Sequence, residues 1–271
     1  MISSSVKFLL NDKLIVIKNP DPNQTLLNYI RTELKKTGTK EGCSEGGCGA
    51  CTIVLGELVD NKIVYKAINS CISFVPSLNG KQLIIVEDLV SQNGKLHPVQ
   101  DAMVKFHGSQ CGFCTPGFVM SLFSMFKNNK SLNNELITDS ISGNLCRCTG
   151  YRPIIDAAKS LNKINKNDQF SKNKNKVIQQ LKKIKPKNIY IKKDDKIYFS
   201  PKNIKDLKGI IKKHSNFSFL AGGTDLSLKV TKERKEIPFI IDLKEINELD
   251  FIKVSKNYLE VGSATPLIKF E

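Results

Sequence analysis

The sequence predicts an α+β protein of several domains, because the hydrophobic periodicity changes twice along its 271 residues. Residues 1–90 alternate short apolar runs, typical of strands, with one helical segment. Residues 91–162 carry apolar side chains spaced three and four apart, as in amphipathic helices. A Lys- and Asn-rich tract at 163–193 precedes residues 194–271, where strand and helix patterns alternate again. We therefore expect three domains and one linker.

The composition is that of a globular protein, with 40% hydrophobic and 25% charged residues. The sequence shows no N-terminal targeting pattern and no apolar run of membrane-spanning length. We therefore expect a soluble, cytoplasmic protein with no membrane partner. In a reducing cytosol, its eight cysteines are expected to be ligands or redox groups rather than structural disulfides.

The net charge of +16 is concentrated in the Lys- and Asn-rich tract. Between Asn162 and Lys193, eleven lysines face one acid, Asp168, so this stretch supplies +10 of the +16. Lys-rich tracts can bind phosphate backbones. This tract has few aromatic residues, no arginine and no recognisable nucleic-acid-binding fold. It is better explained as a solvated, flexible linker, and no nucleic-acid partner is expected.

A hairpin and a helix are expected to open the first domain. The stretch VKFLLNDKLIVI has two apolar runs about an Asn-Asp pair, which is typical of a β-hairpin. In TLLNYIRTEL, Leu27, Ile30 and Leu34 share one helix face, and Thr25 is a candidate N-cap. Further strand patterns follow a glycine-rich loop, so the helix is expected to lie on a small sheet.

The glycine-rich loop EGCSEGGCGACTIVLGEL contains the first candidate metal ligands. Its cysteines form a C-x4-C-x2-C pattern, and a fourth cysteine follows after nineteen residues. The glycines permit positive φ and let backbone amides point inward, as a sulfide-bearing cluster requires. This is the plant-type [2Fe-2S] pattern, whereas zinc, the alternative, more commonly binds two C-x2-C motifs. The first cysteine set is Cys43, Cys48, Cys51 and Cys71.

The second domain is expected to be a small bundle of four helices. HPVQDAMVKFH and PGFVMSLFSMF each place apolar side chains on one face behind Pro98 and Pro116, which suit a first helical turn. A third helix is expected to end near Gly143, and a fourth to begin behind Pro153. Cysteines precede the second and fourth helices as C-x2-C and C-x-C motifs. Two helical hairpins would therefore bring four thiols together.

These four thiols are the expected ligands of a second [2Fe-2S] cluster. Two cysteines that flank one residue are too close in the chain for an unstrained disulfide, and helix N-termini favour the negative charge of a cluster. Zinc is again the alternative, and the C-x-C spacing alone argues only weakly against it. A neighbouring ferredoxin-like pattern favours iron and sulfide. The second cysteine set is Cys111, Cys114, Cys146 and Cys148.

The stretches TGTKEGCSEGGCGACTIVLGEL, SQCGFCTPGFVMSLF and GNLCRCTGYRPIIDAA resemble the iron–sulfur portion of the molybdenum hydroxylases, most closely small subunits of the bacterial xanthine dehydrogenase type. The resemblance covers about residues 6–161. It implies a β-grasp ferredoxin domain and a four-helix domain with one [2Fe-2S] cluster each. It places the first cysteine set nearer flavin and the second nearer a molybdenum-pterin on a partner subunit. It also implies that Gln110 and Cys148 approach that pterin.

Beyond the linker, FSFLAGGTDLSLKV ends a predicted strand in a loop that could wrap amides around a pyrophosphate. The loop lacks the G-x-G-x-x-G fingerprint of a Rossmann domain. It resembles the first FAD loop of the molybdenum hydroxylases, which implies a PCMH-type α+β domain. Since such domains are longer than residues 194–271, we expect a truncated domain that holds FAD weakly or not at all. The implied flavin contacts are Phe219, Leu220, Ala221, Gly222, Gly223, Thr224, Asp225 and Leu226.

No residues for chemistry on a substrate are expected in this chain. The sequence shows no nucleophile, base and orienting group of the hydrolase kind. His97, His107 and His214 lack partners at metal-binding spacing and are expected to be caps or surface groups. The resemblance implies an oxidoreductase subunit that passes electrons to FAD and NAD while a molybdenum subunit converts hypoxanthine and xanthine to urate. The alternatives are the same role for aldehyde, nicotinate or acyl-CoA substrates, and a zinc-stabilised nucleic-acid-binding module.

Overall fold

The computed structural model describes residues 3–184 and 188–270. Residues 185–187 of the expected linker, and positions 1–2 and 271 of the two outer domains, lie outside the described residues. Across the described part of the chain, no helix has both the length and the apolar character needed to cross a bilayer.

A five-stranded sheet with short helical segments forms the first domain, as predicted. Its strands are β1 (Ser5–Leu10), β2 (Lys13–Lys18), β3 (Thr52–Val59), β4 (Lys62–Asn69) and β5 (Gln82–Ile84), and its helical segments are α1 (Leu26–Asn28), η1 (Tyr29–Glu33), η2 (Ser70–Ile72), η3 (Val75–Leu78) and η4 (Val86–Leu89). The strand order is β2-β1-β5-β3-β4, with β1 antiparallel to β2 and parallel to β5. This is the mixed sheet that the predicted β-grasp domain requires.

Local residues explain the start of this domain. Asn11 turns the β1–β2 hairpin at φ +53°, since asparagine tolerates the left-handed region. The Thr25 side chain caps α1 by accepting a hydrogen bond from the Asn28 amide at 3.2 Å. Leu27 and Ile30 of this helical segment are buried, whereas Leu34, the third residue of the predicted face, is half-buried at the C-cap of η1. The predicted helix face is therefore confirmed for its first two residues.

Four helices form the second domain. They are α2 (Pro98–Lys105), α3 (Thr115–Asn128), α4 (Asn134–Ile141) and α5 (Arg152–Ser160), followed by the turn η5 (Leu161–Lys163). The three prolines named in the sequence analysis all lie in first turns. His97 is the N-cap of α2 and accepts a hydrogen bond from the Val99 amide, which confirms its expected capping role.

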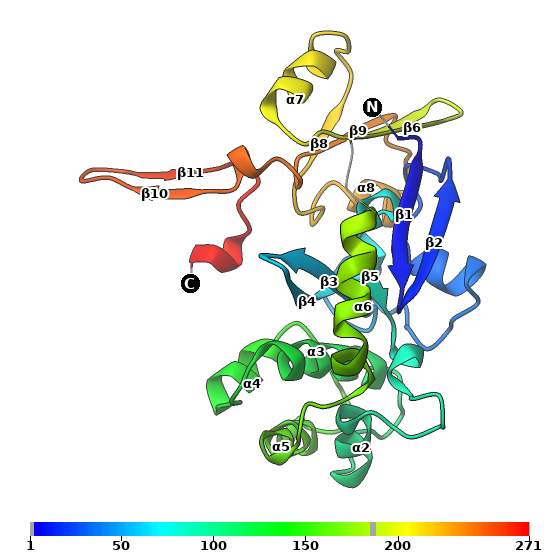
Figure 1. Cartoon of the computed structure of the whole chain (residues 1–271), viewed down its shortest axis with the longest axis vertical. Helices are drawn as coiled ribbons and strands as arrows, with labels where there is room; N and C mark the ends of the chain where they lie inside the picture. Colours follow the sequence, from blue (N-terminus) through cyan, green and yellow to red (C-terminus); the bar gives the residue numbers. More distant parts are fainter. Residues whose placement is uncertain (1–2, 185–187, 271) are drawn as a thin grey trace.

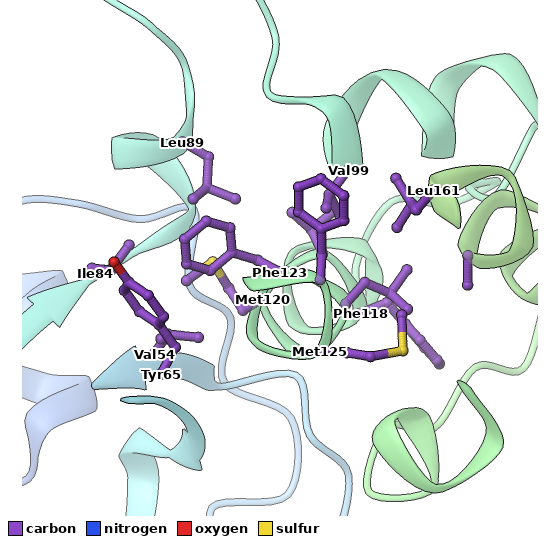
Figure 2. Close-up of a cluster of buried hydrophobic side chains, with 14 of the residues drawn as sticks. Val54, Tyr65, Ile84, Leu89, Val99, Phe118, Met120, Phe123, Met125 and Leu161 are labelled. Carbon is purple, nitrogen blue, oxygen red and sulfur yellow. The ribbon is translucent and has the colours of Figure 1, made fainter. Parts of the chain in front are cut away.

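One hydrophobic core joins the sheet to the helices. Val54, Tyr65 and Ile84 from the strands pack with Met120 and Phe123 of α3, and Phe118 belongs to the same cluster on the other side of that helix (Figure 2). The rings of Tyr65 and Phe123 meet edge to face with centroids 5.7 Å apart. The first two domains therefore share buried surface rather than being tethered as separate units.

In its described parts, 163–184 and 188–193, the tract is not the flexible linker that its composition predicts. It contains the helix α6 (Gln169–Lys183) and the strand β6 (Ile189–Lys193). The lysines of α6 are exposed, while the shared core receives Phe170, Val177 and Leu181. Three well-spaced apolar residues suffice to bury one face of a helix. The lysines of α6 that contribute to the Lys-rich composition of this tract lie on the opposite, solvent-exposed face of the helix.

Polar contacts attach α6 to both preceding domains. At its start, Asp168 caps the helix and pairs with Lys127 Nζ at 2.7 Å and His97 Nε2 at 2.8 Å. Further along, Lys176 Nζ pairs with Asp12 in the β1–β2 turn at 2.8 Å. Figure 1 shows α6 running between the helical domain and the sheet.

The third domain is built on a four-stranded sheet of order β6-β7-β9-β8. Its further elements are β7 (Lys196–Ser200), α7 (Ile204–Ile211), β8 (Ser218–Leu220), α8 (Leu228–Thr231), β9 (Phe239–Asp242), η6 (Asn247–Leu249), β10 (Ile252–Val254), β11 (Leu259–Val261) and η7 (Leu267–Phe270). The predicted strand KIYFSP and the helix after it are β7 and α7. Because β6 pairs with β7, this sheet begins before the expected boundary at 194. Figure 1 shows the third domain and the helical domain at opposite ends, with the first domain between them.

Candidate metal and flavin sites

The first cysteine set lies at one end of the five-stranded sheet. Cys43, Cys48 and Cys51 come from the loop before β3, and Cys71 lies in η2, directly after β4. Since β3 and β4 are paired along their length, their ends bring Cys51 and Cys71 together, with Sγ atoms 3.3 Å apart. The thiols of Cys43 and Cys48 form a second pair within the loop, near enough for each to shift the pKa of the other. The structure thus assembles all four predicted side chains as two pairs.

Backbone amides surround the sulfur of Cys43. The amides of Glu45 and Gly47 donate to Cys43 Sγ at 3.4 and 3.3 Å. This turn passes through Gly46 at φ +79°, where a Cβ would lie 2.6 Å from the Ile72 side chain. Amide donors stabilise a thiolate, so the loop has the inward-pointing amides that its glycines predict.

The second cysteine set lies between helix ends, as predicted. Cys111 and Cys114 precede α3, and Cys146 and Cys148 precede α5. The Sγ atoms of Cys111 and Cys148 lie 3.5 Å apart, and Cys114 and Cys146 form the other pair, in which each thiol shifts the pKa of the other. Cys111 and Cys148 are exposed, whereas Cys146 is buried. One edge of this set therefore opens to the protein surface.

Each of the four pairs combines one thiol of lowered pKa with one of raised pKa. The hydrogen bond between Cys51 and Cys71 lowers the pKa of Cys51 to about 7 and raises that of Cys71. Burial raises the pKa of Cys114 to about 12. Burial opposes ionisation of Cys146, but hydrogen bonds from Thr149 and nearby amides outweigh it and lower the pKa. Each pair favours loss of one proton, and the thiolate is the form that binds metal.

The spacing of the thiols fits two-iron clusters better than single ions. Within residues 3–184 and 188–270, no three Cys, His, Asp or Glu side chains converge as the ligands of one metal ion do. A structural zinc site needs four ligands around one ion. Four thiolates that share two irons can instead be arranged as two separated pairs. Both cysteine sets bring their thiols together in pairs, an arrangement that fits [2Fe-2S] binding.

The predicted flavin loop at 219–226 lies against the first cysteine set. Ser227 Oγ, directly after the loop, donates to the Ile72 carbonyl at 2.8 Å, and the Leu228 side chain packs against the buried cluster that contains Leu27, Cys51, Cys71 and Ile72. Gly223 has φ +84°, and a Cβ there would lie 3.0 Å from the same Ile72 carbonyl. Glycine at this position therefore permits the close approach of the two domains.

The loop divides into residues that anchor it and residues that a ligand could reach. The buried or half-buried members are Leu220, Ala221, Gly223 and Leu226, and the exposed members are Phe219, Gly222, Thr224 and Asp225. A Cβ added at Gly222 would meet nothing within 4 Å, so the backbone there is open. The loop thus offers an accessible turn of backbone held by buried neighbours.

The two residues implied to approach a pterin share one exposed surface. Gln110 and Cys148 are both exposed, and Gln110 directly precedes Cys111, whose sulfur lies beside that of Cys148. The apolar side chains of Phe113 and Leu145 are 48% and 57% exposed in the same two loops. We name these residues the docking face of the second cysteine set.

Sequence reasoning missed a contact between the two cysteine sets. The Leu145 amide donates to the Cys48 carbonyl at 2.9 Å, and buried Asn144 donates to the Gly49 carbonyl at 3.0 Å. The two segments lie far apart in the chain, so no spacing rule predicts the contact. The asparagine two residues before the first cysteine of the C-x-C motif, in GNLCRC, is the signal that could have indicated it.

Replacing Ser227 with alanine is expected to weaken the docking of the flavin loop. Ser227 is fully buried, and loss of its hydrogen bond to Ile72 is expected to lower the free energy of unfolding by about 1 kcal/mol. Denaturant titration measures this change. Ser142→Ala, which removes an exposed bond within one helix end, is the control. Equal stability of the two variants would contradict the assigned role of Ser227.

Three family descriptions match the chain in the order of its domains. Residues 8–76 match a 2Fe-2S iron-sulfur cluster binding domain, and residues 85–159 match a [2Fe-2S] binding domain. Residues 191–271 match an FAD binding domain in molybdopterin dehydrogenase. The chain therefore contains two [2Fe-2S]-binding domains followed by an FAD-binding domain, which is the class of iron–sulfur flavoproteins.

Related proteins narrow this class further. Xanthine dehydrogenase of Blastobotrys adeninivorans is 52% identical over 159 residues, which are 58% of this chain and 11% of that protein. Aldehyde oxidase 1 of Macaca fascicularis is 45% identical over 160 residues, 58% of this chain and 12% of that protein. Among solved structures, the aldehyde oxidoreductase of Desulfovibrio gigas is 32% identical, with a TM-score of 0.52 over 67% of this chain and 18% of that one.

The domain order and these relatives show that the chain is the iron–sulfur and FAD region of a molybdenum hydroxylase, in the family of xanthine dehydrogenases and aldehyde oxidases. It spans 11–12% of the length of the two curated relatives.

Proposed function

We propose that this chain is an electron-transfer subunit of a xanthine dehydrogenase. In this role it takes electrons from a molybdenum-pterin on a separate partner subunit and passes them to FAD and then to NAD, while that partner hydroxylates hypoxanthine and xanthine. The observation that carries the proposal is a continuous series of contacts from the docking face of the second cysteine set, through the first set, to the flavin loop.

In this proposal the eight cysteines hold the clusters. The first cysteine set takes one [2Fe-2S] cluster and the second set takes the other, each through its two pairs of thiols. When bound, each cluster supplies a site that accepts and releases single electrons. The thiol pairs hold that charge in place, and the amides that donate to Cys43 Sγ stabilise it.

The direction of electron transfer between the two cysteine sets is inferred from which parts of the protein cover each set. The second cysteine set has two exposed thiols, so a molybdenum-bearing partner could contact it through Gln110, Cys148 and the neighbouring apolar side chains. The first set is covered by the third domain, where Lys232 Nζ pairs with Glu45 at 3.0 Å and donates to the Cys43 carbonyl at 3.2 Å. We infer that electrons enter at the second set and leave from the first toward residues 219–226.

A reductive titration of the whole purified chain tests the proposal. With dithionite as reductant, we expect uptake of about two electrons, one at each [2Fe-2S] site, in addition to those taken by any bound FAD, and two distinguishable EPR signals. Xanthine alone should reduce neither site, because in this proposal the purine chemistry takes place on the molybdenum-bearing partner. Addition of the molybdenum-bearing partner should make xanthine an effective reductant. Stoichiometric zinc without iron, or purine oxidation by the chain alone, would contradict the proposal.

The same role in an aldehyde-oxidising enzyme is the second candidate. The 45% identity to aldehyde oxidase 1 over the same part of the chain favours it. Both candidates use the same residues of this chain, since the substrate site lies on the partner. Comparison of xanthine with an aldehyde as reductant of the complete complex separates them.

A further inference from the structure

We infer that Asn144 is a positioning residue for electron transfer between the two cysteine sets, because it clamps the backbone contact through which they are joined. This inference rests on the proposed function, and it concerns the route between the sites rather than their identity.

The contact links one cysteine of each set through a single hydrogen bond. The Leu145 amide donates to the Cys48 carbonyl at 2.9 Å. Cys48 belongs to the first set, and Leu145 directly precedes Cys146 of the second. A route therefore runs from the sulfur of Cys48 through its own backbone, across the hydrogen bond, and along the Leu145 backbone to the sulfur of Cys146.

Asn144 holds the two segments in this position. It is 3% exposed, and its side-chain amide donates to the Gly49 carbonyl at 3.0 Å and to Thr52 Oγ1 at 3.2 Å. Its side-chain oxygen accepts a hydrogen bond from Ser121 Oγ at 2.6 Å. Both ends of one side chain are therefore used, one toward the first domain and the other toward α3.

The segments meet backbone against backbone. A Cβ added at Gly117, in the first turn of α3, would lie 2.2 Å from the Gly49 carbonyl oxygen. A Cβ added at Gly49 would lie 2.3 Å from the Gly143 carbonyl oxygen. No side chain can be inserted here without moving the backbone. Since electron tunnelling weakens when a route lengthens or loses contacts, this dense packing favours transfer at this point of the interface.

The step along this route is a one-electron transfer. The second site is oxidised as the first is reduced, and no atom or proton moves with the electron. The Leu145 amide and the Cys48 carbonyl keep their hydrogen bond throughout. Asn144 touches neither metal site and acts by holding this bond.

The test is Asn144→Ala in the full chain, loaded with iron and sulfide. Electrons supplied by a photoreduced deazaflavin enter at the exposed edge of the second cysteine set, and freeze-quench EPR follows their redistribution between the two signals. We expect unchanged iron and sulfide contents, both signals present, and several-fold slower redistribution. In the unloaded and loaded protein alike, the Leu145 amide should exchange faster with solvent.

Asn128→Ala is the matched control. Asn128 also bridges α3 and the first domain, by accepting from the Tyr65 amide at 3.0 Å and donating to the Tyr65 carbonyl at 2.6 Å, but Tyr65 lies in the middle of β4. Loss of the Asn128 side chain weakens the same interface between α3 and the first domain, but at a point away from the cysteines. This variant should redistribute electrons at the wild-type rate.

Two results separate failure of this inference from failure of the proposed function. If both signals are present and Asn144→Ala redistributes electrons at the wild-type rate, the inference is wrong while the proposed function stands. If the unsubstituted chain does not form two clusters, the proposed function fails. If Asn144→Ala loses a cluster, Ser121→Ala serves as the second variant, because it removes only the hydrogen bond from Ser121 to the Asn144 side chain. An unchanged rate of electron redistribution in Ser121→Ala would then overturn the inference.

Discussion

Replacing Cys148 with serine is expected to abolish one of the two EPR signals of the reduced protein and to leave the other intact, while Cys48→Ser does the reverse. Each signal depends on its own four thiolates, and the two cysteine sets share no side chain. Serine offers a harder oxygen ligand of much higher pKa than a thiolate. Iron content should fall by about half in each variant, because one of two [2Fe-2S] sites is lost.

The two substitutions are also expected to differ in their effect on the stability of the protein. Cys148 is exposed, whereas Cys48 is half-buried in the loop that contacts Leu145. Thermal unfolding of Cys148→Ser should therefore stay closer to that of the unsubstituted protein. Leu96→Ala, at an exposed position in the loop before α2, controls for surface substitution in the helical domain. Loss of both signals in either variant would argue against independent sites.

Replacing Asp168 with alanine is expected to lower the free energy of unfolding by about 3–5 kcal/mol, as removal of one partner from a buried ion pair does. The side chains of Asp168, Lys127 and His97 are only 5%, 6% and 1% exposed. Without Asp168 the Lys127 ammonium remains buried without its carboxylate, and α6 loses its N-cap. Because α6 packs on both cysteine-bearing domains, denaturant unfolding followed by far-UV CD measures the loss.

Asp156→Ala is the control for this substitution. Asp156 pairs with Arg152 at 3.3 Å, but those side chains are 37% and 82% exposed. Exposed pairs of this kind contribute about 0.3–0.5 kcal/mol. Similar losses for Asp156→Ala and Asp168→Ala would contradict the assigned importance of the buried pair.

The pH dependence of stability offers an independent measurement on the same residue. Burial opposes ionisation of Asp168, but hydrogen bonds from His97 and Lys127 outweigh it and hold the pKa well below the ordinary value of 3.8. A carboxyl group with a depressed pKa stabilises the fold fully above its unfolded pKa, and this contribution is lost as the pH falls toward the folded pKa. Unfolding free energy should therefore fall more steeply below about pH 4 in the unsubstituted protein than in Asp168→Asn.

The local pattern of the sequence predicted most elements and both cysteine sets. The hairpin at Asn11, the helix cap at Thr25 and the proline-led helices follow from preferences of neighbouring residues, so a single sequence reveals them. The cysteine spacing works in the same way, because ligands in one loop must suit one cluster. The order of the domains likewise follows from the sequence, and the three family descriptions match the chain in the same order.

Only the tertiary structure decided how these parts meet. The composition of α6 concealed its buried face, since three apolar residues among many lysines become meaningful only when a core is available to receive them. The contact of Asn144 with Gly49 joins residues 95 positions apart, and that of Ser227 with Ile72 joins residues 155 positions apart. Such contacts depend on how separate surfaces fit together, and no local periodicity encodes them. The cysteines expected to hold the clusters could therefore be identified from the sequence, whereas the backbone contact between the two cysteine sets required the packed chain.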